Sequence, residues 1–233
     1  LYGAAYKIID VLSSLPYMFA GIILPLLITS WQNNDRPQFN RILQRSFDIM
    51  AMVALPLLVG TQFLADDIII LIAGREFLEA GNILRVLILA VAAIFLGNMM
   101  AHAVIAVQAQ KKVIWIYAFT SLTALGAYLY FIPRFSYFGA AAVTIYSEVA
   151  IAVLSTIFIC RYLKFSLHWT GLIKATVASL LMGLLLWLRP EFFKNSNLGL
   201  GISLVGAIIA YFLFLWLLRA FTRADLSLMT NKQ

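Results

Sequence analysis

Charged residues are scarce in this 233-residue chain. Asp, Glu, Lys and Arg together make up 12% of the sequence, whereas hydrophobic residues make up 63%. A soluble globular domain is about a quarter charged and about half apolar. No hydrophilic stretch is long enough to form a separate soluble domain. The composition therefore predicts an integral membrane protein.

Cysteine is nearly absent, and catalytic motifs are missing. The single cysteine, Cys160, excludes an internal disulfide and a cysteine-based metal site. The sequence contains no Gly-rich phosphate loop, nucleophile elbow or paired catalytic carboxylates. It begins with Leu, and its first apolar segment lacks the basic start and cleavage site of a signal peptide. We expect a chain cut from a longer polypeptide, with no resident cofactor or metal.

Long apolar runs fill most of the chain and predict about seven transmembrane helices. A hydrocarbon core about 30 Å thick requires roughly 20 helical residues. The predicted spans cover residues 4–30, 48–72, 83–107, 113–132, 137–160, 172–188 and 200–218. We therefore expect one all-α polytopic transmembrane helical bundle across residues 1–233.

Polar residues and prolines mark the breaks between these spans. A polar stretch around Asp35 ends the first span, and residues 39–47 are predicted to form a short amphipathic helix at the interface. Asp66 and Asp67 interrupt the end of the second span, so its last turns are expected to be interfacial. Pro133 is expected to end the fourth span.

The basic residues predict an orientation. Eleven of the 17 Lys and Arg residues lie after the first, third, fifth and seventh spans, and six lie on the other side. Cytoplasmic loops carry the excess of Lys and Arg. We therefore expect the N-terminus of this chain outside and its C-terminus in the cytoplasm. The formal charge of +7 is then a topology signal rather than a sign of nucleic-acid binding.

Several stretches, taken in order, resemble a known family. They are the opening LYGAAYKIIDVLSSLPYMFAGIILPLL, then LADDIIILIAGREFLEAGNILRVL, AVQAQKK, IPRFSYFGAAAVTIYSEVA and the closing FTRADLSLM. The family is the Wzx-type lipid-linked oligosaccharide flippases, which are polysaccharide biosynthesis proteins of the MATE-like exporter superfamily. Each motif is loose, but together they cover nearly the whole chain in the family's order.

The resemblance implies a fold and a domain organisation. Members have roughly twelve to fourteen helices in two lobes that rock about a central cavity. This chain resembles the C-terminal half, starting near the eighth helix of a fourteen-helix member. That helix runs from outside to inside, which agrees with the orientation from the basic residues. A cavity between lobes would need the missing half.

The resemblance also implies a function. Such a protein is a secondary-active flippase that moves undecaprenyl-pyrophosphate-linked oligosaccharide across the inner membrane, driven by a proton or sodium gradient. Its partners would be proteins of surface-polysaccharide assembly (O-antigen, capsule or exopolysaccharide). A MATE-like, cation-coupled exporter of drugs or small molecules remains an alternative, because the few intramembrane charges do not distinguish the two classes of substrate. A membrane enzyme would need catalytic acids in a sizeable loop, and these loops are short.

Glu148 is the main candidate for a coupling residue. It lies near the middle of the fifth predicted span, where a charge costs at least about 2.5–3.5 kcal/mol on insertion scales. Low dielectric favours the neutral carboxyl, so Glu148 is expected either to exchange a proton or cation during transport or only to fix helix packing. In the packing interpretation, the neighbouring Tyr146 or Ser147 would form a hydrogen bond with the Glu148 carboxyl group.

Two further polar pairs have helical spacing. Lys7 and Asp10 share a face of the first span and would contact substrate phosphate and a coupling ion, or, as we favour, form an ion pair. Asn98 and His102 are four residues apart on the third span. They would line a polar cavity or relay a proton, since His titrates close to neutral pH, or, as we favour, form an interhelical hydrogen-bond pair.

Three arginines follow the first span. Arg36, Arg41 and Arg45 would attract anionic lipid headgroups or the pyrophosphate of the substrate on the cytoplasmic face. The alternative is that they only set topology.

Overall fold

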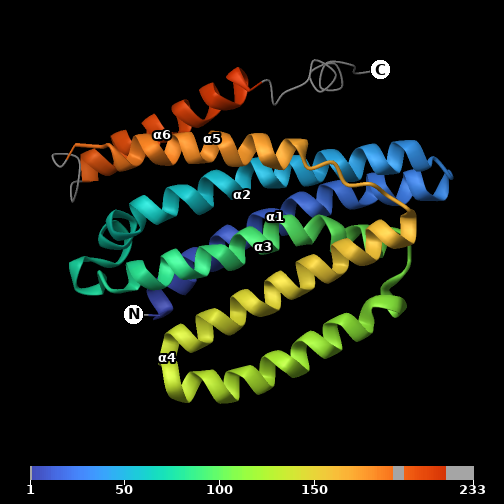
Figure 1. Cartoon of the computed structure of the whole chain (residues 1–233), viewed down its shortest axis with the longest axis horizontal. Coiled ribbons are helices and arrows are strands. Elements are labelled where there is room, and N and C mark those ends of the chain that lie inside the picture. Colours follow the sequence, from blue (N-terminus) through green and yellow to red (C-terminus); the bar gives the residue numbers. More distant parts are fainter. Residues whose placement is uncertain (1, 191–196, 219–233) are drawn as a thin grey trace.

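The structure, a computed structural model, describes residues 2–190 and 197–218, and all regular structure within them is helical. In these residues the order of elements is α1 (Tyr2–Gln32), α2 (Arg36–Ala73), η1 (Arg75–Phe77), α3 (Ala80–Ala106), α4 (Gln110–Leu163), α5 (Thr170–Trp187) and α6 (Asn197–Leu217). Each of the α-helices is long and apolar enough to cross a membrane. The predicted all-α transmembrane bundle is therefore confirmed (Figure 1).

Helix α4 forms two crossings. Its 54 residues would extend about 80 Å if straight, far beyond a hydrocarbon core of roughly 30 Å. The chain instead reverses at Ser136, where φ is 51° and ψ is −130°, and Figure 1 shows two arms. We call residues 110–135 the first arm and residues 137–163 the second arm. With two crossings in α4, the described residues make seven crossings, although the predicted break at Pro133 lies three residues too early.

Gly139 permits the tight reversal. A Cβ atom placed on it would lie 2.4 Å from the carbonyl oxygen of Phe131 and 2.7 Å from the carbonyl carbon. Both atoms belong to the backbone of the first arm, so a side chain at position 139 could not be accommodated by a rotamer change. The arms approach this closely because glycine has no Cβ.

Helix α2 is longer than the sequence predicts. Asp35 caps its N-terminus by accepting a hydrogen bond from the Gln38 amide at 3.0 Å, and α2 then continues without a break to Ala73. The separate interfacial helix expected at residues 39–47 is therefore wrong. Phe39, Leu43 and Phe47 are buried in the core, because their spacing places them on one face that packs against the bundle.

Helix α3 is the centre of the bundle. In its most apolar 18-residue window 61% of the residues are buried, against 17–33% in the other helices. It packs against α1, α2 and α4. It approaches α4 closely at Gly97, where a Cβ would lie 2.5 Å from the Cβ of Ala152.

Helices α5 and α6 lie on one side of this bundle (Figure 1). Helix α5 packs against α2, and α6 packs against α5 and more lightly against α2. The two helices bury a smaller apolar cluster of their own with α2. A hydrogen bond from the Tyr211 hydroxyl to the Met52 carbonyl oxygen, 2.7 Å long, also joins α6 to α2.

The connections alternate between two ends of the molecule. The α1–α2, α3–α4 and α4–α5 connections leave one end in Figure 1, whereas the α2–α3 connection and the reversal of α4 lie at the other. The first group carries most of the predicted cytoplasmic Lys and Arg residues. The structure thus places these basic residues at one end, and their location in the cytoplasm stays a prediction.

Candidate functional site

Glu148 lies near the middle of the second arm of α4 and is half-buried. Ala152 and Ser155 follow it at i+4 and i+7, so the three residues share one face of the arm. Ala152 packs directly on Gly97 of α3. Glu148 therefore lies on the side of α4 that faces the bundle, one turn from a close contact with α3.

Two tyrosines from other crossings accompany this carboxyl group. The Tyr17 side chain interacts electrostatically with Glu148 and with Tyr117. Tyr17 belongs to α1 and Tyr117 to the first arm of α4, so three crossings contribute to the cluster. The Tyr17 side chain is 55% exposed, which leaves the cluster accessible from the surface of the described bundle. We call Tyr17, Tyr117 and Glu148 the acid–tyrosine cluster.

The neighbours of Glu148 in the sequence are engaged elsewhere. The Tyr146 hydroxyl is hydrogen-bonded to Thr123 Oγ1 at 3.0 Å, and Ser147 Oγ donates to the Thr144 carbonyl oxygen at 2.9 Å. Within the described residues neither side chain is hydrogen-bonded to Glu148. The predicted hydrogen bond between Glu148 and Tyr146 or Ser147 is therefore wrong.

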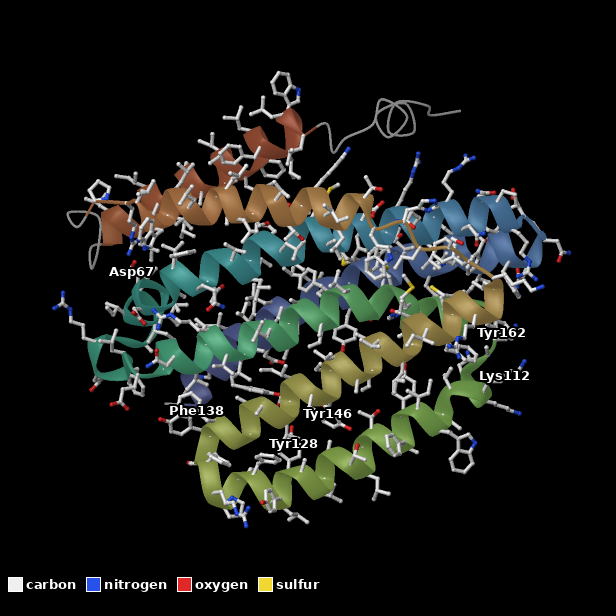
Figure 2. All side chains as sticks on the ribbon, in the orientation of Figure 1. Asp67, Lys112, Tyr128, Phe138, Tyr146 and Tyr162 are labelled. Carbon is white, nitrogen blue, oxygen red and sulfur yellow. The ribbon has the colours of Figure 1, made fainter. Side chains whose placement is uncertain are left out.

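Hydrogen bonds between the arms hold this part of α4 in place. Besides the contact of Tyr146 with Thr123, the Tyr128 hydroxyl is 3.0 Å from Thr144 Oγ1. Figure 2 shows Tyr128 and Tyr146 between the two arms. These bonds position the second arm, and with it Glu148, relative to the first.

Asn98 and His102 do not form the interhelical pair that we favoured. The His102 ring donates from Nδ1 to the Asn98 backbone carbonyl oxygen at 2.9 Å, within α3. The nearest acceptor for a helical His is often the carbonyl one turn earlier. The Asn98 side chain is 7% exposed, and its Nδ2 has no hydrogen-bond partner among the described residues.

Lys7 and Asp10 are both exposed on α1, and no ion pair joins them in the described part of the chain. The favoured ion pair is therefore wrong. An exposed pair gains at most about 1 kcal/mol, too little to hold two flexible side chains together.

The predicted arginines lie far from the acid–tyrosine cluster. Arg36 starts α2 and stacks on Trp31, with 3.6 Å between the guanidinium carbon and the ring centroid. Arg41 is exposed one turn later, and Arg45 is half-buried. The structure thus groups them at the end of the bundle, whereas Glu148 lies near mid-span.

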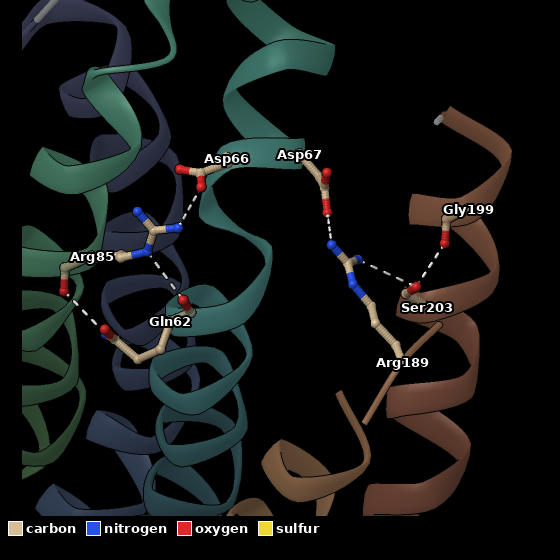
Figure 3. Close-up of polar contacts among 7 residues, drawn as sticks. All are labelled: Gln62, Asp66, Asp67, Arg85, Arg189, Gly199 and Ser203. Carbon is tan, nitrogen blue, oxygen red and sulfur yellow. Dashed lines mark hydrogen bonds and ion pairs between the residues drawn. The ribbon is translucent and has the colours of Figure 1, made fainter. Parts of the chain in front are cut away.

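Asp66 and Asp67 take part in two ion pairs that the sequence did not predict (Figure 3). Asp66 pairs with Arg85 of α3 at 2.7 Å, and the Arg85 Nε donates to the Gln62 carbonyl oxygen at 3.1 Å. Asp67 pairs with Arg189, which follows α5, and both side chains are largely buried. Asp67 is therefore part of a buried ion pair, and the interfacial position of these last turns of α2 stays a prediction.

The same Arg189 reaches α6. Its Nη1 lies 3.5 Å from Ser203 Oγ, and Ser203 in turn donates to the Gly199 carbonyl oxygen at 2.7 Å (Figure 3). Arg189 therefore connects α2, α5 and α6 at one end of the bundle. Its partner Asp67 is 122 residues away in sequence, and no local pattern indicates the pairing.

The described residues hold no group of three or more His, Cys, Asp or Glu side chains placed to bind a metal ion. Apart from the Asp67–Arg189 ion pair, the polar groups inside the described bundle include the Glu148 carboxyl group, hydroxyls and the Asn98 amide. Such groups can exchange a proton or contact a monovalent cation or a polar substrate. We therefore regard the acid–tyrosine cluster as the candidate functional site.

The described residues define an all-helical, multi-pass membrane protein. Its fold is similar to that of a solved membrane flippase, the lipid II flippase MurJ in an inward closed conformation. The TM-score is 0.71, and the match covers 88% of this chain and 44% of the MurJ chain at 20% sequence identity. The chain thus spans less than half the length of that flippase.

No model of a protein family and no curated protein matches the chain. At 20% identity, the likeness to MurJ shows a shared fold. It agrees with the all-α transmembrane fold that the sequence predicts.

Proposed function

We propose that this chain forms one lobe of a secondary-active transporter that moves a lipid-linked oligosaccharide across the inner membrane. The observation that carries the proposal is the fold, which matches a lipid-linked-substrate flippase over 88% of the chain. The seven crossings, with α3 at the centre and α5 and α6 at the periphery, account for one lobe, and a second lobe would complete a cavity. The oligosaccharide would serve surface-polysaccharide assembly, whose proteins would be its partners.

In this proposal the acid–tyrosine cluster couples transport to an ion gradient. Glu148 is half-buried in a crossing and receives no hydrogen bond from the described residues, so it is open to a proton or to Na⁺. Tyr17, from α1, interacts electrostatically with Glu148 and with Tyr117 of the first arm. Lys7, exposed on α1, is the proposed contact for a substrate phosphate, and Asp10, Asn98 and His102 are proposed to line the cavity.

The cell-based test uses the native gene product that contains this chain. Glu148→Gln keeps the size of the side chain but removes its ionisation. In a strain that lacks the gene, we expect the wild type to restore surface polysaccharide and E148Q to restore at least tenfold less at equal expression. Lipid-linked oligosaccharide should accumulate in the E148Q cells.

Glu76→Gln is the matched control. Glu76 is an exposed acid in η1, outside the candidate site, and its substitution makes the same chemical change. We expect E76Q to behave as the wild type. Full complementation by E148Q would contradict a coupling role for Glu148, and an unchanged polysaccharide level without the gene would contradict the substrate class.

An exporter of cationic drugs is the second candidate. The observation that favours it is the chemistry of the acid–tyrosine cluster, since a carboxyl group beside tyrosine rings suits an organic cation. Extrusion of a fluorescent organic cation that is lost in E148Q, with surface polysaccharide unchanged, would support this candidate instead.

A further inference from the structure

The reversal of α4 brings basic residues together at the opposite end of the hairpin. Lys112 Nζ, in the first turn of α4, lies 4.6 Å from the ring centroid of Tyr162 near the end of the second arm (Figure 2). Lys111, Arg161 and Lys164 are close neighbours of these residues in the chain. Four cations from the two arms therefore gather at one place, which we call the basic hairpin base (Lys111, Lys112, Arg161 and Lys164).

Ion pairs within the described residues do not neutralise this charge. All four cations are exposed, and none is ion-paired in that part of the chain. From residue 86 to residue 190 the sequence contains one acid, Glu148, which lies near the middle of the second arm. The two arms of α4 therefore present a net positive charge at the basic hairpin base.

Lys111 and Lys112 also occupy an unfavourable place in the helix. They lie in the first turn of α4, which contains no acidic residue. The positive end of the helix dipole repels cations there. The positive-inside rule requires cations on this side of the membrane, but it does not require them in the first turn of a helix. A bound anion would offset their repulsion by the helix dipole.

Aromatic side chains place the cluster at headgroup depth. Trp115, one turn after Lys111, is 78% exposed, and the Tyr162 ring beside Lys112 is also exposed. Exposed Trp and Tyr residues at span ends lie at the membrane–water interface. The cations are therefore level with the phosphates of the bilayer.

We propose that the basic hairpin base binds the headgroup of an anionic phospholipid. The occupant follows from charge complementarity and depth. A bilayer lipid presents its phosphate at this level, and the four cations form no ion pair within the described residues. This inference is independent of the transported substrate.

Quenching of Trp115 fluorescence tests it. Purified full-length protein is placed in bilayers that contain brominated phosphatidylglycerol or brominated phosphatidylcholine, and Trp115→Phe isolates the signal of this residue. We expect the wild type to prefer phosphatidylglycerol, and the preference to weaken in high salt. K111Q/K112Q should reduce the preference on the order of tenfold.

Two controls separate the loss of lipid preference in K111Q/K112Q from a general loss of positive charge and from misfolding. R75Q/R134Q removes two exposed cations from the other end of the bundle and should keep the preference. K111R/K112R changes the same positions but keeps the charge and should also keep it. Equal quenching by both lipids in the wild type, or equal losses in K111Q/K112Q and R75Q/R134Q, would overturn the proposal. Displacement of phosphatidylglycerol by inorganic pyrophosphate would assign the surface to a pyrophosphate ligand and overturn it as well.

Discussion

Asp66 and Asp67 are adjacent in the sequence but lie in different surroundings. The Asp66 side chain is 43% exposed and pairs with Arg85, whose side chain is 26% exposed. The Asp67 side chain is 6% exposed and pairs with Arg189, whose side chain is 11% exposed. Because a buried charge that loses its partner stays desolvated, the two carboxylates should contribute very differently to stability.

Asn substitutions at the two positions should therefore have unequal effects. Asp67→Asn leaves the Arg189 guanidinium buried and should destabilise the protein by about 3–5 kcal/mol. Asp66→Asn disrupts a solvent-exposed pair and should cost at most about 1 kcal/mol. Thermal unfolding in detergent, followed by size-exclusion chromatography, measures both variants.

The double variant Asp67→Leu with Arg189→Met is the control. It removes both charges and fills the space with apolar side chains, so it should recover most of the stability that D67N loses. Equal unfolding temperatures for D66N and D67N would show that the burial of the Asp67–Arg189 pair does not matter.

The cluster around Glu148 shows what a residue-by-residue prediction can find. An acid within an apolar span stands out in the sequence, and the structure places it facing the bundle. Tyr17 and Tyr117 gave no such signal, because tyrosine is common in membrane spans and at interfaces. Only the folded arrangement of α1 and α4 links Tyr17 electrostatically to both Glu148 and Tyr117.

At the scale of elements, the hairpin of α4 depends on one glycine. Gly139 faces the Phe131 carbonyl group of the first arm, whereas a Cβ on Gly126, within that arm, would meet nothing within 4 Å. The two positions therefore form a matched pair for the same substitution.

Gly139→Ala should open the reversal, because the obstructing atoms belong to the backbone. We expect a lower unfolding temperature and faster proteolysis between the two arms. Gly126→Ala should be neutral or stabilising by up to about 1 kcal/mol, since alanine favours the helix. Equal unfolding temperatures for G139A and the wild type would contradict the close approach at the reversal.

Most helices could be predicted from the sequence because a membrane demands about 20 apolar residues for each crossing. The boundaries were less certain. Pro133 predicted the end of an arm, but proline is tolerated within membrane helices, and the chain reverses at Ser136 instead. The stretch 39–47 has the pattern of an interfacial helix, yet its apolar face packs on the bundle.

At the scale of the whole molecule, the structure has one central helix and a peripheral pair. Helix α3 packs against α1, α2 and α4, whereas α5 and α6 attach to α2 through an apolar cluster and polar contacts. These contacts include Arg189 with Asp67 and Tyr211 with Met52. Long-range pairs of this kind depend on packing, so a single sequence does not reveal them.

The central claim is that the protein moves a lipid-linked oligosaccharide, and transport in proteoliposomes tests it most directly. Purified full-length gene product is reconstituted with a fluorescent lipid-linked oligosaccharide, and its appearance in the opposite leaflet is followed with and without a proton or sodium gradient. We predict movement above that of protein-free vesicles, accelerated by one of the gradients. Movement no faster than in protein-free vesicles under either gradient would contradict the account.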